Sequence, residues 1–280
     1  MKTIFKISIF WAFGLLLSCN SGVEVERISA DKLVTVNAFI SPKDSIIRVY
    51  VFKGGALGDV LNVEKAVIKN ATVSIANDLG GKGLFFDEKS NSYIISNQLF
   101  RVMPTKKHFL KVKTAEGIEL NAECVVPASP DEPVIEGNKD NNDFGFSLAW
   151  PSEQTRYYTV LFDLINVDFT PRLGASSGPS LGFVASANLF DNKDRSPKPV
   201  EWKIRNAFLA NKISLQTVFT SLDENAYKYL KTRETAYSWN RNSGNFFPNL
   251  QEPQPVFSNI RGGVGVFGAY NSVEKIVVIK

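Results

Sequence analysis

The chain has 280 residues, 44% of them hydrophobic and 12% aromatic, and a formal net charge of +4. This length suffices for two domains of ordinary size after removal of a leader, and the composition argues against a disordered chain. The 32 basic residues are spread along the sequence, which argues against a nucleic-acid surface that binds by releasing counterions. The nearest approach to a basic cluster, residues 106–108, is predicted as a solvated turn.

Residues 1–18 have the features of a lipoprotein signal peptide. Lys2 and Lys6 precede an apolar run that ends in Leu16-Leu17-Ser18-Cys19. A basic head, an apolar core of about ten residues and a small residue at the cleavage point are what a secretory signal needs. The run is too short for a permanent anchor. We expect cleavage before Cys19 and lipidation of its thiol; an ordinary signal peptide or an uncleaved anchor is the alternative.

Residues 19–31 are predicted to form a flexible tether behind the lipid. They have no period that would bury one face, and they carry Glu24, Glu26 and Asp31. An acidic stretch after the lipidated cysteine directs some Gram-negative lipoproteins to the cell surface, and the spaced acids here match it in part. We expect a lipid anchor in the outer membrane, and the cell-surface face is favoured over the periplasmic face.

Residues 32–128 are predicted to form an N-terminal β-sandwich of immunoglobulin or transthyretin type. Runs rich in β-branched and aromatic residues are separated by Pro, Gly, Asn and Asp, with no amphipathic helix between them. These runs are residues 33–40, 46–52, 71–76, 93–96, 109–114 and 118–126. A short connection ending in Gly117 predicts a hairpin between the last two runs.

Residues 129–143 are predicted as a linker or an edge loop, since Pro127, Pro130 and Pro133 lie among polar residues around its start. A second strand series then begins and predicts a C-terminal β-rich domain over residues 144–280. Its expected strands are residues 144–150, 157–165, 181–189, 213–220, 264–270 and 273–279.

One helix is predicted over residues 221–239 of the second domain. Ser221 and Glu224 fit a capping box, and Leu222, Ala226 and Leu230 recur on one face. We expect this helix to pack on the sheet. The predicted fold class is mainly β, with two β-sandwich-like domains and one packed helix in the second.

Two glycine patterns match functional motifs on paper but lack the context that those motifs need. Residues 263–268 fit a dinucleotide-binding pattern, yet only twelve residues follow and these predict a strand. We expect a bulge or a close backbone approach there instead. Residues 174–178 fit a nucleophile elbow, but Pro179 follows where a helix must begin, and the sole histidine, His108, precedes the serine.

No metal centre, cofactor or catalytic residue is expected. Cys124 lies on the apolar phase of residues 118–126 and is predicted as a buried small hydrophobe. With one histidine and one unlipidated cysteine, a zinc or transition-metal cluster is not expected. Residues 140–143 could offer oxygens to calcium, but turn chemistry explains them better.

Carboxylates leave one enzymatic alternative open. A glycan hydrolase needs two carboxylates that are close in space, and nothing in the sequence singles out a pair. The available residues are Asp163, Asp168, Asp191 and Asp194.

Aromatic side chains after the predicted helix are the better indication of binding. Trp239, Arg241, Phe246 and Phe247 lie in or near a turn-rich stretch. Such rings can stack on sugars or act as anchors in a partner interface. Core packing is favoured for each ring taken singly. As a cluster, the four residues are the predicted contact with a peptide or oligosaccharide ligand, or with a protein partner.

Several stretches together resemble a family of Bacteroidota outer-membrane lipoproteins catalogued as a domain of unknown function. The matching stretches are residues 16–19, 33–42, 69–73, 126–128, 221–230 and 255–270. The last stretch, which runs from Pro255 to Tyr270, is the most specific. The resemblance covers nearly the whole mature chain.

The resemblance implies a cellular location and partner proteins rather than a chemical activity. Such lipoproteins look like neighbours of TonB-dependent, SusC-like β-barrel receptors, and no catalytic residues are attached to the family. We expect a non-enzymatic accessory or ligand-binding subunit of such a receptor. The alternatives are a structural or adhesive surface lipoprotein and, third, a glycan hydrolase.

Overall fold

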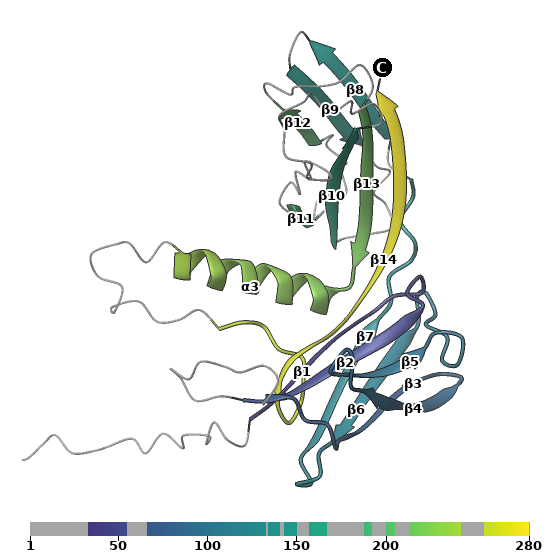
Figure 1. The fold of residues 1–280 in the computed structure, drawn as a ribbon, viewed down its shortest axis with the longest axis vertical. Coiled ribbons are helices and arrows are strands. Elements are labelled where there is room, and N and C mark those ends of the chain that lie inside the picture. The colour runs from purple at the N-terminus through teal and green to yellow at the C-terminus, as the bar shows by residue number, and fades with distance from the viewer. Residues whose placement is uncertain are drawn as a thin grey trace, which may run out of the picture.

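The structure is a computed structural model that describes most of residues 33–132 and shorter pieces beyond them. The described residues are 33–54, 66–132, 134–140, 143–149, 157–166, 188–191, 200–204, 213–241 and 255–279. These residues form a mainly β fold with one long helix, which confirms the predicted fold class. Figure 1 shows a curled sheet in the lower part, long strands above it and the helix projecting to one side.

The first part of the fold contains the six predicted strands and one more. Its strands are β1 (Val34–Ile40), β2 (Ile46–Lys53), β3 (Thr72–Asn77), β4 (Gly80–Asp87), β5 (Ser92–Ser96), β6 (Lys107–Lys113) and β7 (Glu119–Val125). The additional strand is β4, where three glycines and mostly exposed side chains give no apolar alternation. The predicted hairpin after β6 is confirmed, because the Gly117 amide donates to the Thr114 carbonyl at 3.0 Å.

The core of this part lies inside the curl of the sheet. Alternate residues of β1, β2, β3, β5, β6 and β7 point inward; Val36, Val49, Ile75 and Leu120 are among the fully buried ones. Cys124 is one of these residues and is 2% exposed, which confirms the prediction of a buried apolar role. Burial also raises the pKa of its thiol well above the ordinary value.

The second part contains a small sheet, a set of long strands and the helix. Its elements are β8 (Val134–Asp140), β9 (Asp143–Ala149), β10 (Tyr157–Asn166), β11 (Asn188–Asp191), β12 (Val200–Ile204), β13 (Ile213–Leu222), α3 (Glu224–Arg241) and β14 (Val264–Ile279). Strand β8 lies within residues 129–143, where a linker or edge loop is expected. The three prolines all precede Val134, so they do not interrupt the pairing of β8 with β9.

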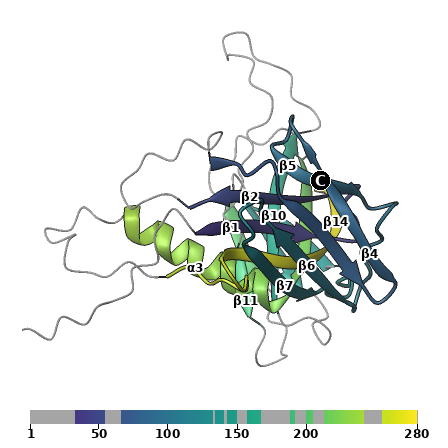
Figure 2. The same ribbon diagram turned by 90° about the horizontal axis from the view of Figure 1, so that it is seen from below.

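A single strand, β14, connects the two predicted domains. It pairs in parallel with β1 from Val264 to Ala269 and antiparallel with β13 from Tyr270 to Ile279. The two expected strands 264–270 and 273–279 are therefore one continuous strand, the yellow arrow of Figure 1. As a result, eleven strands form one sheet in the order β11-β10-β13-β14-β1-β2-β5-β4-β3-β6-β7, and β12-β9-β8 form another. Figure 2 shows β1 between β2 and β14.

Glycine is required where β14 meets β1. Gly265 has a φ of +119°, and a Cβ atom at this position would overlap the carbonyl oxygen of its parallel partner Val36. Gly268 lies directly beneath α3, where a Cβ would meet the Cβ of Ala226 at 3.0 Å. The glycines of residues 263–268 thus serve close backbone approach, as the sequence predicts, and they lie at the start of a strand.

We expect Gly265→Ala to destabilise the chain by about 3 kcal/mol or more, because it combines a strained φ with a backbone overlap. The free energy of unfolding from chemical denaturation measures this effect. Gly83→Ala is the matched control, since a Cβ there meets only the Val73 carbonyl oxygen at 3.9 Å. Equal stability of the two variants would contradict the close approach of β14 to β1.

Candidate functional site

The start of α3 is fixed by Asp223 rather than by the predicted capping box. Ser221 belongs to β13 and is fully buried. Asp223 Oδ1 accepts hydrogen bonds from the amides of Ala226, in the first turn of α3, at 2.8 Å and of Ala269, in β14, at 3.1 Å. The capping-box prediction was wrong by two residues, because the strand continues to Leu222 and the next residue becomes the N-cap.

The same carboxylate joins three elements of the fold. Its pKa is raised to about 6 because burial disfavours the charge, although hydrogen bonds from the backbone of Ala269, Ala226 and Val125 oppose the shift. The Asp223 amide also donates to the Ala269 carbonyl at 3.0 Å. Asp223 therefore holds α3 against β14 and the end of β7.

One face of β1 points into the core, and its other, outer face forms one wall of a groove. The other wall is α3. Alternation along the antiparallel pair places Asn37 beside Tyr50 and Phe39 beside Arg48 on this outer face. Tyr229 of α3 lies over Phe39 with ring centroids 6.0 Å apart. A hollow of about 450 Å³ lies between these elements. We call it the α3 groove; its aromatic and charged residues are Phe39, Asp44, Arg48, Tyr50, Tyr229, Arg233 and Tyr270.

The floor of the α3 groove contains a hydrogen-bonded Asp–Tyr pair. The hydroxyl of Tyr270, on β14, donates to both carboxylate oxygens of Asp44 at 2.8 Å. Burial raises the pKa of Asp44, opposed by this hydrogen bond and by the charge of Arg48. Burial, with the hydrogen bond to Asp44 next, raises the pKa of Tyr270 as well. Tyr270 therefore stays protonated at neutral pH and can donate this hydrogen bond.

Two arginines stand at the groove, one on each wall. Arg48 comes from β2, and Arg233 comes from α3, where its guanidinium lies over the Tyr229 ring at 5.9 Å from the centroid. Both side chains are exposed. Among the described residues, no carboxylate lies within ion-pair distance of either guanidinium. The groove thus offers aromatic rings, one carboxylate and two available cations.

A larger hollow of about 840 Å³ lies between the outer side of β7, the start of α3 and residues 258–261. Two of the asparagine side chains that line it are already used within the fold. Asn225 Nδ2 and Asn259 Nδ2 both donate to the Glu123 carbonyl, at 3.0 and 3.1 Å. This region closes the edge of β7, and we regard the α3 groove as the better candidate site.

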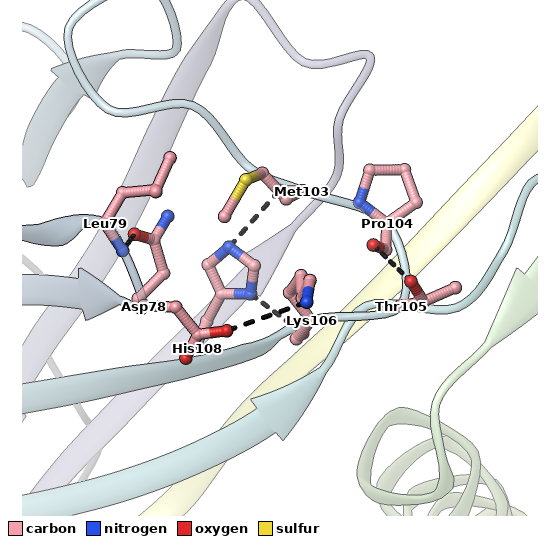
Figure 3. Close-up of polar contacts among 8 residues, drawn as sticks. Asp78, Leu79, Met103, Pro104, Thr105, Lys106 and His108 are labelled. Atoms are coloured by element: carbon pink, nitrogen blue, oxygen red, sulfur yellow. Dashed lines mark hydrogen bonds and ion pairs between the residues drawn. The ribbon is translucent and has the colours of Figure 1, made fainter.

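His108 has a structural role, contrary to the prediction of a solvated turn over residues 106–108. It lies on β6 (Figure 3) and is fully buried, because the strand alternation turns Lys107 outward and His108 inward. Nδ1 donates to the Lys106 carbonyl at 3.1 Å, and Nε2 accepts from the Met103 amide at 3.3 Å. Burial lowers its pKa. His108 is therefore a neutral residue that connects the strand to the preceding loop.

The residues singled out in the sequence are only partly visible in the structure. Trp239 and Arg241 belong to the C-terminal end of α3, whose side chains there lie outside what the structure describes. Phe246, Phe247 and Cys19 lie outside the described residues altogether, so the four-residue contact and the lipidation site stay predictions. The sequence analysis did not predict the α3 groove. The feature that could have indicated it is the set of polar and aromatic residues at the outward-facing positions of residues 33–40 and 46–52.

Comparison with known proteins gives a family and no further functional information. A family model described as "Domain of unknown function (DUF4249)" matches residues 22–276. No curated protein matches the chain. Within the described ranges, no helix has the length and hydropathy needed to cross a membrane, and no cluster of three or more potential metal ligands occurs.

Solved structures show only distant likeness. One chain, from "Cytokine receptor complex - Crystal form 1A", is 12% identical with a TM-score of 0.26, and the match covers 67% of this chain and 84% of that one. Another, a "Putative membrane anchored protein from Corynebacterium diphtheriae", is 13% identical with a TM-score of 0.22, covering 68% and 54%. At these TM-scores neither carries an argument about fold or function.

We expect Asp223 to make the stability of the chain depend on pH in an unusual direction. Its pKa is about 6 in the folded chain and near 3.8 when unfolded, so the folded state holds the proton more tightly. The free energy of unfolding should therefore fall by about 2 kcal/mol from this group as the pH rises from 4 to 7.

Denaturation of the wild type and Asp223→Asn at several pH values measures this contribution. An amide Oδ1 can still accept the Ala226 and Ala269 hydrogen bonds. The stability of the variant relative to the wild type should therefore rise by about 2 kcal/mol between pH 4 and pH 7. Asp131→Asn, at an exposed carboxylate, is the control. Parallel profiles for the wild type and Asp223→Asn would show instead that folding does not raise the pKa of Asp223.

Proposed function

The chain belongs to the family described as Domain of unknown function (DUF4249), and we propose that it is a lipid-anchored, non-enzymatic binding subunit. In this proposal, Cys19 carries the lipid, the outer membrane is the location, and the cell-surface face is preferred over the periplasmic one. The partner is a TonB-dependent, SusC-like β-barrel receptor of Bacteroidota type, and the chain contributes to capturing its nutrient.

The observation that supports a binding role is the α3 groove. Aromatic rings from four separate elements line a hollow of about 450 Å³, within the range of about 300–1,000 Å³ usual for ligand sites. The walls are held from behind, because β1 and β2 pack their other face into the core. A groove on such a rigid support is suited to binding with little rearrangement.

The proposal is tested by purifying the tagged, natively lipidated full chain from detergent-solubilised outer membrane and identifying its companions by mass spectrometry. We expect a large β-barrel receptor in near-stoichiometric amount. Intact-mass measurement of the chain should show a diacylglycerol-modified Cys19 at its N-terminus.

Cys19→Ser is the matched control, because it removes the thiol that carries the lipid and leaves the described fold unchanged. We expect this variant to be released from the membrane and to recover less of the receptor. A wild-type chain that purifies alone, together with a deletion strain that loses cell attachment but keeps nutrient uptake, would overturn the proposal in favour of adhesion.

A further inference from the structure

The two arginines of the α3 groove define the charge of what it binds. Arg48 and Arg233 stand on opposite walls, and among the described residues neither guanidinium lies within ion-pair distance of a carboxylate. Asp44 is the one carboxylate that lines the groove, and Arg48 acts on it only at longer range, so the two cations outnumber it. The stacking of Arg233 on Tyr229 limits its orientations without using its N–H donors. A guanidinium binds a carboxylate through two parallel hydrogen bonds. The ligand that complements this pair of cations is an anion.

The groove backbone is closed to an extended peptide that would add itself as a strand. Recognition of that kind needs free backbone N–H and C=O groups at a sheet edge. In the groove wall, β1 is paired with β14 on one side and with β2 on the other, and β2 is also paired with β5. Ligand recognition in the groove must therefore come from side chains.

The side chains present suit a sugar ring. The apolar face of a pyranose packs on aromatic rings, here Phe39 and Tyr50 on the sheet and Tyr229 on α3. A carboxylate has about four acceptor positions, so Asp44 can accept ligand hydroxyls besides the Tyr270 bond. Rings, hydroxyl acceptors and cations thus occur together in one hollow.

We propose that the α3 groove binds an acidic oligosaccharide, with uronate carboxylates on Arg48 and Arg233 and sugar rings against Phe39, Tyr50 and Tyr229. The inference deepens the proposed function and rests on it for a ligand-binding role. It names the chemistry of the cargo, a uronic-acid polymer fragment, independently of which receptor receives it.

Isothermal titration of the full chain with uronate oligosaccharides tests the inference. The probes are trimers of galacturonate and of mannuronate and a tetrasaccharide of hyaluronan, with methyl-esterified trigalacturonate and neutral galactotriose as matched controls. We expect at least one acidic probe to bind, and the neutral controls to bind at least about tenfold more weakly, because they lack the charges that the arginines recognise.

Variants localise the binding. Arg48→Gln and Arg233→Gln should each weaken it about tenfold, and Tyr50→Leu should weaken it while sparing the charge preference. Arg101→Gln is the matched control, because Arg101 is exposed and lies outside the groove. Circular dichroism and thermal melts show that each variant is folded.

Three outcomes would overturn the inference: no acidic probe binds, the neutral controls bind equally well, or the groove arginine variants match Arg101→Gln. Binding of tetraglutamate in place of the sugars would assign the groove to acidic peptides instead. A receptor recovered with a chain that binds no uronate would reject the ligand and keep the proposed function. Uronate binding by a chain that recovers no receptor would support the ligand and reject the receptor partnership of the proposed function.

Discussion

The close approach of β14 to β1 is the constraint on which the rest of the structure depends. Parallel pairing beside Val36 leaves no room for a side chain at Gly265, so the backbone there is reserved for glycine. The same strand continues past Tyr270 as the partner of β13. Since β14 is shared, the hydrogen bonding of one half of the chain extends directly into the other.

The position of α3 follows from this shared strand. Gly268 allows the first turn of α3 to lie directly on β14, and Asp223 links that turn to the Ala269 amide on the same strand. Tyr157 stacks on Tyr227 at 4.4 Å and holds the helix against β10. With the helix fixed, Tyr229 and Arg233 are held over the outer face of β1 and β2. The groove is therefore a consequence of the packing that joins the two halves.

The sequence predicted local structure well where a strand buries one face. β1, β2, β6 and β7 alternate regularly, and their predicted positions differ from the structure by at most two residues. β4 was not predicted, because it is glycine-rich and largely exposed. Local sequence patterns could not predict that β14 pairs with both β1 and β13, since its pairing with β1 joins residues more than 220 positions apart.

The α3 groove could not be predicted either, because it too depends on contacts between residues far apart in the sequence. Its residues belong to the turn before β2 and to β1, β2, α3 and β14, and only the tertiary packing brings them together. A local signal did exist: the outward positions of β1 and β2 carry Phe39, Arg48 and Tyr50, where a purely solvated face needs no aromatic rings. His108 shows the opposite error, because a charged neighbourhood in sequence concealed a buried position on an alternating strand.

The direction of β1 relates the groove to the proposed anchor. The tether from Cys19 would enter the fold at Val34, the first residue of β1, whereas the groove lies by Phe39 and the turn that contains Asp44. A strand of seven residues spans about 20 Å. If Cys19 carries the lipid, the groove lies toward the end of β1 that is remote from the point where the anchored chain enters the described fold.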